Sequence, residues 1–415
     1  MTTDLLDQIQ KLQFDDRAAA EAMLLDFVRG QFALDVERVE LRPLAVSLNS
    51  FNGFLYLRGG ERLFFKTHTE PDNIVGEYYN AEQLAEAGYP ILRPRMQSTE
   101  VGKQLLIYDY IDAPSVFDVA WAIEQGDARE SASLSAAQGA LDDALWAIYE
   151  RTLAPQSAED AERAPVHQLF YHRLTGGRLA RFYGPDAPPL RIDDRAVAFA
   201  DVRRLKWTIN GQRYDLSLDD IIARAIALLH PAQPGPSIAG HGDAHNGNLF
   251  YHKDAPGEVH LTYFDPAFAG RHHPLLDLTK PLFHNVFAMW MYHPADKAAR
   301  AQIAARIDGD RITVTHDYAL HPIRLMFWRS KVERVLIPTL KLLTAKEQLR
   351  ADWRAYLKAA LFCCPLLTKN LLDADTYPPE IALLGLAQTV EMGAESAGVR
   401  SLVDTTLDEV ERTLN

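Results

Sequence analysis

The chain has 415 residues, of which 47% are hydrophobic and 24% are charged, a composition typical of a globular protein with a large core. Its length exceeds that of one ordinary compact domain and predicts two or three structural units. The formal net charge is −13. This charge argues against a nucleic acid or an anionic membrane surface as partner, because both need a basic protein surface.

The termini and the cysteines bear on the compartment. Residues 1–17 lack the basic start and apolar core of a signal peptide, and no apolar run approaches the roughly 20 residues that span a bilayer. The two cysteines, Cys363 and Cys364, are adjacent in an apolar run, which predicts buried, reduced thiols. We therefore expect a cytoplasmic protein that is not inserted in a membrane.

The first third of the chain predicts helices followed by a sheet. Two short amphipathic helices meet around Asp15-Asp16 and form an N-terminal extension over residues 1–36. Residues 37–112 predict a small antiparallel sheet with one inserted helix. The strands are expected at Val39–Val46, Phe54–Arg58, Leu63–His68 and on either side of Gly102, the helix at Pro71–Ala87, and turns at Asn52-Gly53 and Gly59-Gly60.

Beyond Pro114 the pattern changes, and residues 113–415 predict one large, mainly helical unit. Residues 128–139 and 155–165 are rich in small and polar side chains and predict loose connections. A hairpin turn is expected at 209–212, and the chain from Lys280 onward is expected to be mainly helical. The predicted fold class is α+β, with a small sheet lobe and a large helical lobe.

Polar side chains gather in the segment 241–248, which reads His-Gly-Asp-Ala-His-Asn-Gly-Asn. Two apolar, strand-like segments follow, and a hairpin formed by them would bring Asn248 and Asp265 side by side. Hard carboxylate and amide oxygens suit Mg²⁺, which keeps substrate phosphates among its ligands. Asp243 could then accept a proton from an attacking hydroxyl. A short polar loop alone is often only a structural turn, but two such loops at this spacing favour a site.

The pattern His241-Gly-Asp-x-His-x-x-Asn248, followed by Asp265 and by Asp277-Leu278, resembles the catalytic core of the aminoglycoside phosphotransferase and choline kinase superfamily. Members of this superfamily are small-molecule kinases with a protein-kinase-like fold. The resemblance implies a catalytic loop at 241–248 and a metal loop at 265–278. Many members have Asp-Trp-Glu where this chain has Asp265-Pro266-Ala267, a form that resembles the branch with the fructosamine kinases.

The resemblance also implies roles for single residues. Asp243 would be the catalytic aspartate, and Asn248 and Asp265 would be the Mg²⁺ ligands. His241 would organise the backbone of the loop, and Asp277 would brace the loop without touching substrate.

A kinase site also needs positive charge on the nucleotide phosphates. Lys66 follows the apolar run 63–65, as a lysine projecting from a sheet would, and Glu77 on the next helix is expected to fix its ammonium. The segment 105–111 resembles the hinge strand between the lobes, where Asp109, Tyr110 and Ile111 would contact the nucleotide base. Ser50, in a turn with a single glycine, would cover the phosphates. The chain has neither a GxxxxGK[ST] loop nor a GxGxxG fingerprint.

Acceptor specificity in the superfamily lies in the helical lobe. Trp290 belongs to an aromatic-rich segment, 283–292, that could stack on a sugar, although such a stripe is more often core. Arg271 and His245 could reach an acceptor or could serve only the local structure. A sugar or amino sugar is the leading prediction, with choline, another amino alcohol or an aminoglycoside as the alternative.

The sequence thus predicts a Mg²⁺-dependent kinase that transfers the terminal phosphoryl group of ATP or GTP to a hydroxyl of a small molecule. Two other classes stay open. One is a non-catalytic pseudokinase that binds nucleotide. The other is a metallohydrolase built on His241, Asp243 and His245, which would hold zinc or iron tightly.

Overall fold

A computed structural model describes residues 5–42, 51–67, 74–98, 100, 103–193, 195–255 and 258–414, without the side chains of 74–79 and 255. Ser50 and the side chain of Glu77 lie outside the described part of the chain. The fold mixes helices with antiparallel sheets, and its elements form two units with separate hydrophobic cores.

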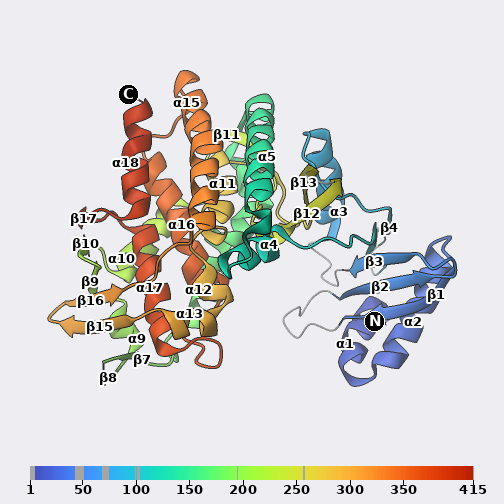
Figure 1. The fold of residues 1–415 in the computed structure, drawn as a ribbon, viewed down its shortest axis with the longest axis horizontal. Coiled ribbons are helices and arrows are strands. Elements are labelled where there is room, and N and C mark those ends of the chain that lie inside the picture. Colours follow the sequence, from blue (N-terminus) through green and yellow to red (C-terminus); the bar gives the residue numbers. More distant parts are fainter. Residues whose placement is uncertain are drawn as a thin grey trace.

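The first unit, here called the sheet unit, combines a five-stranded antiparallel sheet with two helices (Figure 1). The strand order is β1-β2-β3-β5-β4. The elements are α1 (Leu5–Asp15), α2 (Arg17–Gln31), β1 (Val36–Leu41), β2 (Asn52–Leu57), β3 (Arg62–Thr67), β4 (Met96–Ser98) and β5 (Leu105–Asp109). Strand side chains alternate between the two faces. One face therefore gives Leu63 and Phe65 of β3 to a core shared with Leu24 and Phe27 of α2.

Local signals explain this unit, with one correction. Asp16 begins α2, and its carboxylate accepts a hydrogen bond from the amide of Ala19 at 3.0 Å, which confirms the predicted pair of helices. Asn52-Gly53 was expected to be a turn, but it begins β2. A Cβ at Gly53 would lie 2.0 Å from the carbonyl oxygen of Glu40. The glycine therefore allows close approach of two strands. The turn at Gly60, where φ is +85°, is confirmed.

Helix α3 (Ile74–Glu86) lies between β3 and β4 in sequence but packs on the other unit, against β11 (Gly235–Gly240) and β14 (Gly270–His272). Leu84, near its end, and Tyr89 belong to the larger core. The hydroxyl of Tyr89 donates to the carbonyl of Ala239 at 3.0 Å, and the side-chain amide of Asn80 donates to the carbonyl of Pro266 at 3.1 Å. The helix therefore connects the sheet unit to the segment that holds Asp265.

The second unit, here called the helical unit, contains the remaining elements around one large core. Its helices are α4 (Val116–Glu124), α5 (Ser131–Thr152), α6 (Ala158–Glu162), α7 (Tyr171–Thr175), α8 (Arg178–Tyr183), α9 (Phe199–Val202), α10 (Leu218–Leu228), α11 (Pro274–His284), α12 (Met289–Tyr292), α13 (Pro294–Arg300), α14 (Pro322–Lys331), α15 (Ile337–Ala345), α16 (Trp353–Thr368), α17 (Pro379–Gly393) and α18 (Leu402–Leu414). Short 3₁₀ turns lie at Ala128–Glu130, Pro165–Leu169 and Asn246–Asn248, and a π-helical turn at Val332–Leu336 joins α14 to α15.

Small sheets complete the helical unit. Strands β6 (Ala154–Gln156), β11 (Gly235–Gly240) and β14 (Gly270–His272) form one sheet, and β12 (Leu249–Ala255) pairs with β13 (Glu258–Tyr263). A five-stranded sheet has the order β15-β16-β9-β10-β17, with β9 (Lys206–Ile209), β10 (Gln212–Tyr214), β15 (Ile303–Asp308), β16 (Arg311–His316) and β17 (Ala397–Gly398). Strands β7 (Leu190–Ile192) and β8 (Arg195–Val197) form a separate pair.

One sequence expectation for this unit is wrong. Residues 128–139 were expected to connect helices loosely, yet α5 begins at Ser131 and buries Leu134 completely. The region after Lys280 is mainly helical, as expected, although 303–316 forms the hairpin β15–β16. The predicted hairpin turn at Asn210-Gly211 is confirmed between β9 and β10.

The structure also answers the questions about the cysteines and membrane spans. Cys363 and Cys364 are free and buried in α16, as the sequence predicted. Among the helices that the structure describes, none has both the length and the apolar character needed to cross a bilayer.

Candidate active site

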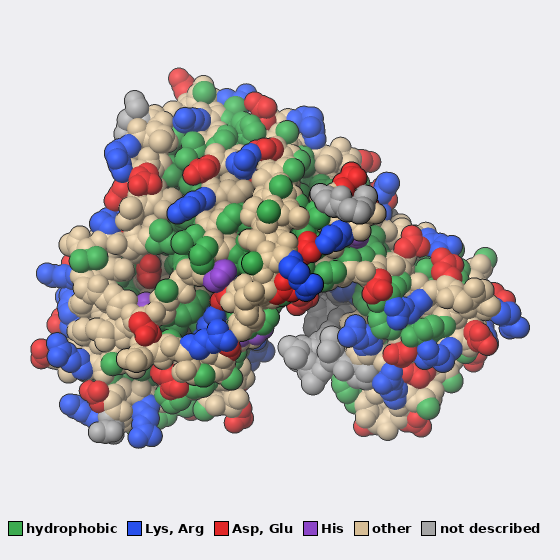
Figure 2. Space-filling view, in the orientation of Figure 1, with side chains coloured by type: hydrophobic (Ala, Val, Ile, Leu, Met, Phe, Trp, Pro, Cys, Tyr) green, Lys and Arg blue, Asp and Glu red, His purple; other side chains and the backbone are tan. Residues whose placement is uncertain are grey.

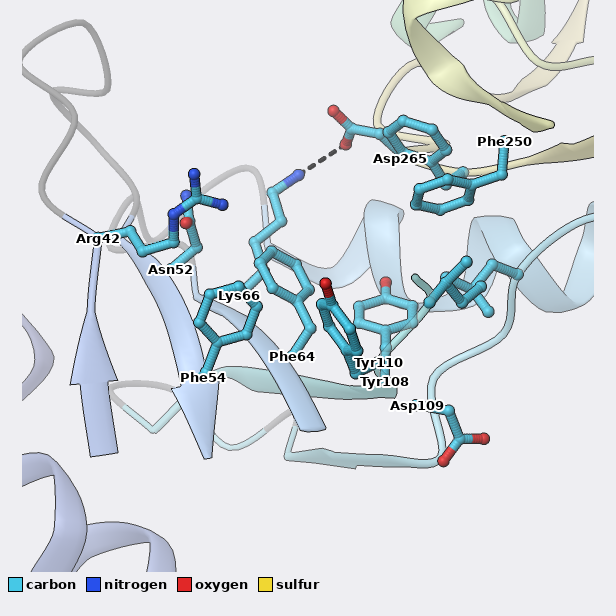
Figure 3. Close-up of a pocket in the computed structure, with 13 residues that line it drawn as sticks. Arg42, Asn52, Phe54, Phe64, Lys66, Tyr108, Asp109, Tyr110, Phe250 and Asp265 are labelled. Atoms are coloured by element: carbon cyan, nitrogen blue, oxygen red, sulfur yellow. Dashed lines mark hydrogen bonds and ion pairs between the residues drawn. The ribbon is translucent and has the colours of Figure 1, made fainter. Parts of the chain in front are cut away.

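A cavity of about 420 Å³ lies between the two units, where the space-filling view shows the molecule hollowed (Figure 2). The sheet contributes the face opposite to α1 and α2, because Phe64 and Lys66 alternate with the core residues of β3. Aromatic rings stand on both sides of the cavity (Figure 3). They belong to Phe54, Phe64, Tyr108 and Tyr110 from the sheet unit and to Phe250 and Phe264 from the helical unit.

Lys66 and Asp265 meet across this cavity (Figure 3). The Lys66 Nζ lies 2.6 Å from Oδ1 of Asp265, although 199 residues separate them in sequence. The structure thus brings together the two charged residues that the sequence analysis assigned to phosphates and metal. The pairing of Lys66 with Glu77 stays a prediction, as does the role of Ser50.

The three hinge residues Asp109, Tyr110 and Ile111 all line the cavity. The carboxylate of Asp109 turns away from Lys66 (Figure 3) and lies 3.2 Å from the guanidinium of Arg95. The guanidinium of Arg62 lies over the ring of Tyr110, 3.4 Å from the ring centroid. Any contact of Asp109 with a nucleotide would therefore come from its backbone, as the hinge resemblance implies.

The loop 241–248, for which the resemblance implies a catalytic role, follows β11 and is held by His241, which is fully buried. Its Nε2 lies 3.0 Å from the carbonyl oxygen of Phe264, and its Nδ1 faces the amide of Asp243 at 3.4 Å. Both ring nitrogens are thus engaged with backbone, which fits the loop-organising role that the resemblance implies. It also removes one ligand from the proposed His241, Asp243 and His245 metal cluster.

Asp277, on α11, braces the loop from below. Its Oδ1 accepts a hydrogen bond from the amide of Gly242 at 2.6 Å and lies 3.0 Å from Nε2 of His272. Its Oδ2 accepts a hydrogen bond from the hydroxyl of Tyr149. Burial raises the pKa of Asp277, but the bonds from His272, Tyr149 and Gly242 outweigh it and lower that pKa below its usual value. The brace is therefore an ionised, fully bonded carboxylate.

Asn248 and Asp265 stand at the same end of the β12–β13 hairpin. The amide of Phe264 donates to the carbonyl of Asn248 at 3.0 Å, so the backbone of Asn248 lies beside the residue that precedes Asp265. The Asn248 Nδ2 donates to the carbonyl of Asp243 at 2.9 Å, so its oxygen is the atom that can serve as a ligand. Asp265 adopts a left-handed backbone with φ of 56°. A carboxylate and an amide oxygen are a donor set that fits Mg²⁺.

Asp243 is the carboxylate of the loop itself. Its Oδ1 is buried and has no hydrogen-bond partner among the described residues. Burial raises its pKa, but the electrostatic interactions with His245, Lys280 and Arg173 outweigh burial and lower the pKa below its usual value. The side chain is therefore ionised at neutral pH and has an oxygen available to accept a proton.

His245 supports the loop and also faces Asp243. Its Nδ1 accepts a hydrogen bond from the amide of Gly247 at 3.0 Å and caps the short 3₁₀ turn. Its Nε2 lies 3.8 Å from Oδ2 of Asp243. Burial lowers the pKa of His245, so the ring is neutral at pH 7. Contact of His245 with an acceptor stays a prediction.

Two predicted substrate residues are not brought to this site. The Arg271 guanidinium donates to the carbonyls of Thr152 at 2.7 Å and Ser237 at 3.0 Å, so it links β14 to β11 and to the end of α5. Trp290 is completely buried, and its Nε1 donates to Oε1 of Gln388 at 2.7 Å. The structure therefore assigns Arg271 to the sheet and Trp290 to the core, because their polar atoms are used there.

Sequence analysis missed Lys280, His284 and Asn285 on and after α11. Asn285 accepts a hydrogen bond from the amide of Asn246 at 2.7 Å through its side-chain oxygen and so fixes the loop. Lys280 reaches Asp243, with Nζ 3.9 Å from Oδ1. The available signal was a lysine three residues after Asp277, within an otherwise apolar helix.

Among the described residues, no group of three or more His, Cys, Asp or Glu side chains is arranged to hold a metal ion. The metallohydrolase hypothesis is weakened chiefly by His241, whose two nitrogens are already bonded to backbone.

Comparisons with known proteins give structural neighbours only. No protein-family model matches the chain, and no curated protein matches it. The chain is similar to aminoglycoside phosphotransferase APH(4)-Ia, with 12% identity, a TM-score of 0.46 and coverage of 89% of this chain and 98% of that one. It is also similar to an amicoumacin kinase in complex with AMP-PNP, Ca²⁺ and Ami, with 14% identity, a TM-score of 0.44 and coverage of 95% and 92%. A macrolide 2′-phosphotransferase from Brachybacterium faecium has 12% identity, a TM-score of 0.38 and coverage of 94% and 97%.

All three neighbours are phosphotransferases or kinases of small molecules by name. At these identities and TM-scores the likeness does not assign an activity. The function has to be argued from the residues of this chain.

Proposed function

We propose that the protein is a small-molecule kinase with a bilobal, protein-kinase-like arrangement, which transfers the terminal phosphoryl group of a nucleotide to a substrate hydroxyl. The observation that carries the proposal is the contact of Lys66 with Asp265 at 2.6 Å across the cavity. Two segments 199 residues apart supply the positive and negative charges that a phosphate group and its metal need, and they supply them at one point.

The cavity fits a nucleotide in shape and in chemistry. Its aromatic walls suit a base and its volume of about 420 Å³ lies in the range of small-molecule sites. The hinge backbone at 109–111 would meet the base edge. Lys66 stands at the polar end of the cavity and would bind the phosphates of ATP or GTP.

Asn248 and Asp265 would hold Mg²⁺ at the same end. The bound ion would supply charge neutralisation on the nucleotide phosphates. The two residues flank the same end of the β12–β13 hairpin, and the side-chain amide of Asn248 donates to the carbonyl of Asp243, which would link the metal site to the catalytic loop.

Asp243 would act on the acceptor. The acceptor oxygen forms a bond to the terminal phosphorus while the bond from that phosphorus to the bridging oxygen of the nucleotide breaks. The proton of the hydroxyl passes to Asp243, and the nucleoside diphosphate leaves with the electron pair of the broken bond. The low pKa of Asp243 keeps it ionised for this role, and orienting the hydroxyl contributes as much as the proton transfer itself.

From the resemblance to the superfamily, we further propose that the acceptor is a sugar or amino sugar and that the protein is cytoplasmic. Two buried free thiols fit a reducing compartment. A non-catalytic pseudokinase is less well supported, because the chain has a residue at each position to which the resemblance assigns phosphate binding, catalysis or metal binding, namely Lys66, Asp243, Asn248 and Asp265.

The test is to incubate the purified protein with Mg-ATP, or Mg-GTP, and a panel of sugars, amino sugars, hydroxy acids and amino alcohols, with ³¹P NMR to detect a new phosphate monoester. We expect one acceptor class to give a monoester and to accelerate formation of the nucleoside diphosphate. Nucleotide binding without any monoester would instead indicate a pseudokinase. Zinc or iron that survives dialysis, together with hydrolysis that needs no nucleotide, would indicate the metallohydrolase.

A further inference from the structure

Buried basic side chains in the helical unit are paired with carboxylates, as the cost of burying a charge requires. Each such pair makes a hydrogen bond between nitrogen and carboxylate oxygen. These pairs are Lys297 with Glu124, Arg324 with Glu124, Lys331 with Asp142, and Lys358 with Asp404.

Lys280 does not follow this rule. It is 3% exposed, yet its closest carboxylate oxygen is Oδ1 of Asp243 at 3.9 Å, which is beyond a hydrogen bond. Its nearest hydrogen-bonding partner is Nε2 of His284 at 3.4 Å. Burial and the charge of Lys280 lower the pKa of His284 well below its usual value, so this partner is neutral and compensates no charge.

Arg173, on α7, is a second basic group without a partner. The structure gives its guanidinium no hydrogen bond and no ion pair among the described residues. Burial lowers its pKa, and Asp243 is the strongest opposing charge that it experiences. Lys280 thus lies 3.9 Å from Asp243 without a hydrogen bond to it, and Arg173 is attracted by the charge of the same carboxylate.

Two further cations extend this cluster. Lys369 is half-buried, and its Nζ lies 5.7 Å from the ring centroid of Tyr292. The hydroxyl of Tyr292 lies 2.8 Å from Nδ1 of His284, which connects Lys369 to the surroundings of Lys280. Arg178 donates to the carbonyl of Leu367 at 3.2 Å and adds positive charge beside Arg173.

The surroundings of Asp243 are therefore cationic, although the chain as a whole carries a net charge of −13. A ligand with an ammonium group would be repelled here by Lys280 and Arg173, and all three cations would have to share the carboxylate of Asp243. An oxyanion would instead give both cations the partner that the other buried lysines and arginines already have, and charge-assisted hydrogen bonds of this kind are strong.

We propose that the acceptor carries an anionic oxygen group, a carboxylate or a phosphate, beside the hydroxyl that is phosphorylated, and that Lys280 and Arg173 bind this group. This inference rests on the proposed kinase function and narrows it. It favours a hydroxy acid or a sugar acid or sugar phosphate over an amino sugar, choline or an aminoglycoside. Lys280 and Arg173 are specificity-determining residues, and Asp243 keeps its role toward the hydroxyl.

The first experiment measures binding and does not depend on phosphoryl transfer. Gluconate, glucitol and glucamine share one polyol chain and end in a carboxylate, a hydroxymethyl and an aminomethyl group. Glucose 6-phosphate and glucose form a second matched pair, and glycerate and glycerol a third. Isothermal titration of the full chain with each probe gives the affinities. We expect the anionic member of at least one set to bind roughly 10- to 100-fold more tightly than its neutral counterpart, since hydrogen bonds to charged groups have this worth.

Variants locate the binding site of the anionic group. Arg173→Met and Lys280→Met should each remove most of the preference for the anionic probe. Arg204→Met and Lys346→Met, which alter exposed residues of the same unit, should leave it unchanged. Thermal unfolding of each variant checks the fold, and Arg173→Met remains informative if Lys280→Met is unstable.

The outcomes separate this inference from the kinase proposal. Equal or tighter binding of the neutral or cationic probes in every set overturns it, whether or not the protein is a kinase. So does a Lys280→Met variant that loses phosphoryl transfer equally for anionic and neutral acceptors, because that result would assign Lys280 to the transferred phosphoryl group. Carboxylate and phosphate probes, compared directly, decide which oxyanion the site prefers. Anion binding without any phosphoryl transfer would support the anion site and contradict the kinase.

Discussion

The two walls of the cavity are built on different principles. The sheet wall presents Lys66 and a set of aromatic rings, and Lys66 contacts Asp265 of the opposite wall. The helical wall holds a loop whose position is fixed from several sides, by His241, Asp277 and Asn285. The sheet wall is suited to bind a charged ligand. The helical wall holds the loop 241–248 in one preorganised conformation.

We therefore expect substitutions in the two walls to have different effects on activity and stability. Changes at the catalytic loop should abolish transfer or destabilise the fold, whereas changes at the sheet wall should weaken nucleotide use in a protein that stays folded.

The largest effect is expected for Asp243→Asn. Without a carboxylate to accept the proton and orient the hydroxyl, kcat should fall about 10³-fold, within the range for a general base. Nucleotide affinity should stay at the wild-type value, because Asp243 does not face the phosphates in the proposed site. Single-turnover assays and titration with a nucleotide measure the two quantities separately. Unchanged transfer in this variant would remove Asp243 from the mechanism.

Lys66→Met should have the next largest effect. The loss of a positioned cation at the phosphates is expected to lower kcat/KM for the nucleotide about 10²-fold, with little change in the unfolding midpoint. Lys103→Met, an exposed lysine of the same unit that pairs with Glu100, is the matched control. If both variants behave alike, the sheet wall does not bind phosphates.

Asp277→Asn tests the preorganised wall. The carboxylate and His272 are both buried, and removing one partner of a buried pair is strongly destabilising. We expect the free energy of unfolding to drop by about 3 kcal/mol in urea titrations, together with a lower kcat. A variant that keeps wild-type stability but loses activity would mean that Asp277 acts at the substrate.

The pH dependence of stability should reflect buried histidines of the helical unit. Burial lowers the pKa of His167 to about 4 and of His273 to about 3. The unfolded chain therefore takes up these protons near pH 6.5 while the folded chain does not, so acid favours unfolding. As the pH falls from 6.5 to 5, each histidine should lower the free energy of unfolding by about 2 kcal/mol. In His167→Gln, the free energy of unfolding, measured by denaturation at several pH values, should fall less between pH 6.5 and pH 5 than in the wild type. An equal fall in both proteins would contradict the burial of His167.

The smallest effect is expected for Trp290→Phe. The loss of the hydrogen bond to Gln388 and of some packing should lower stability by about 1 to 2 kcal/mol. KM for the acceptor should not change, because the side chain is in the core. A raised KM at unchanged stability would return Trp290 to the substrate site.

Local patterns were sufficient to predict much of the site. The hairpin after the loop could be predicted because its strands are adjacent in sequence, and it fixes Asn248 next to Asp265. Lys66 at the end of a short apolar run was likewise visible, since strand alternation places it on one face of the sheet.

Long-range packing explains what the sequence did not reveal. Whether Trp290 lies in the core or at a ligand depends on α17, which brings Gln388 to its indole nitrogen. Lys280 comes from a helix that approaches Asp243 only in the folded chain, so its position three residues after Asp277 did not by itself indicate a contact with Asp243. The hairpin at 303–316 had a signal, Asp308-Gly309 between alternating residues, which the helical expectation for this region obscured.

The most direct test of the proposed site is a titration of wild-type protein and Asp265→Asn with the non-hydrolysable nucleotide AMP-PNP, with and without Mg²⁺. If Lys66, Asn248 and Asp265 form one phosphate and metal site, Mg²⁺ should tighten binding to the wild type about tenfold or more, and Asp265→Asn should lose this gain, because the charge of its carboxylate is what the ion requires. Nucleotide affinity that is the same with and without Mg²⁺, or a gain that survives in Asp265→Asn, would contradict the site.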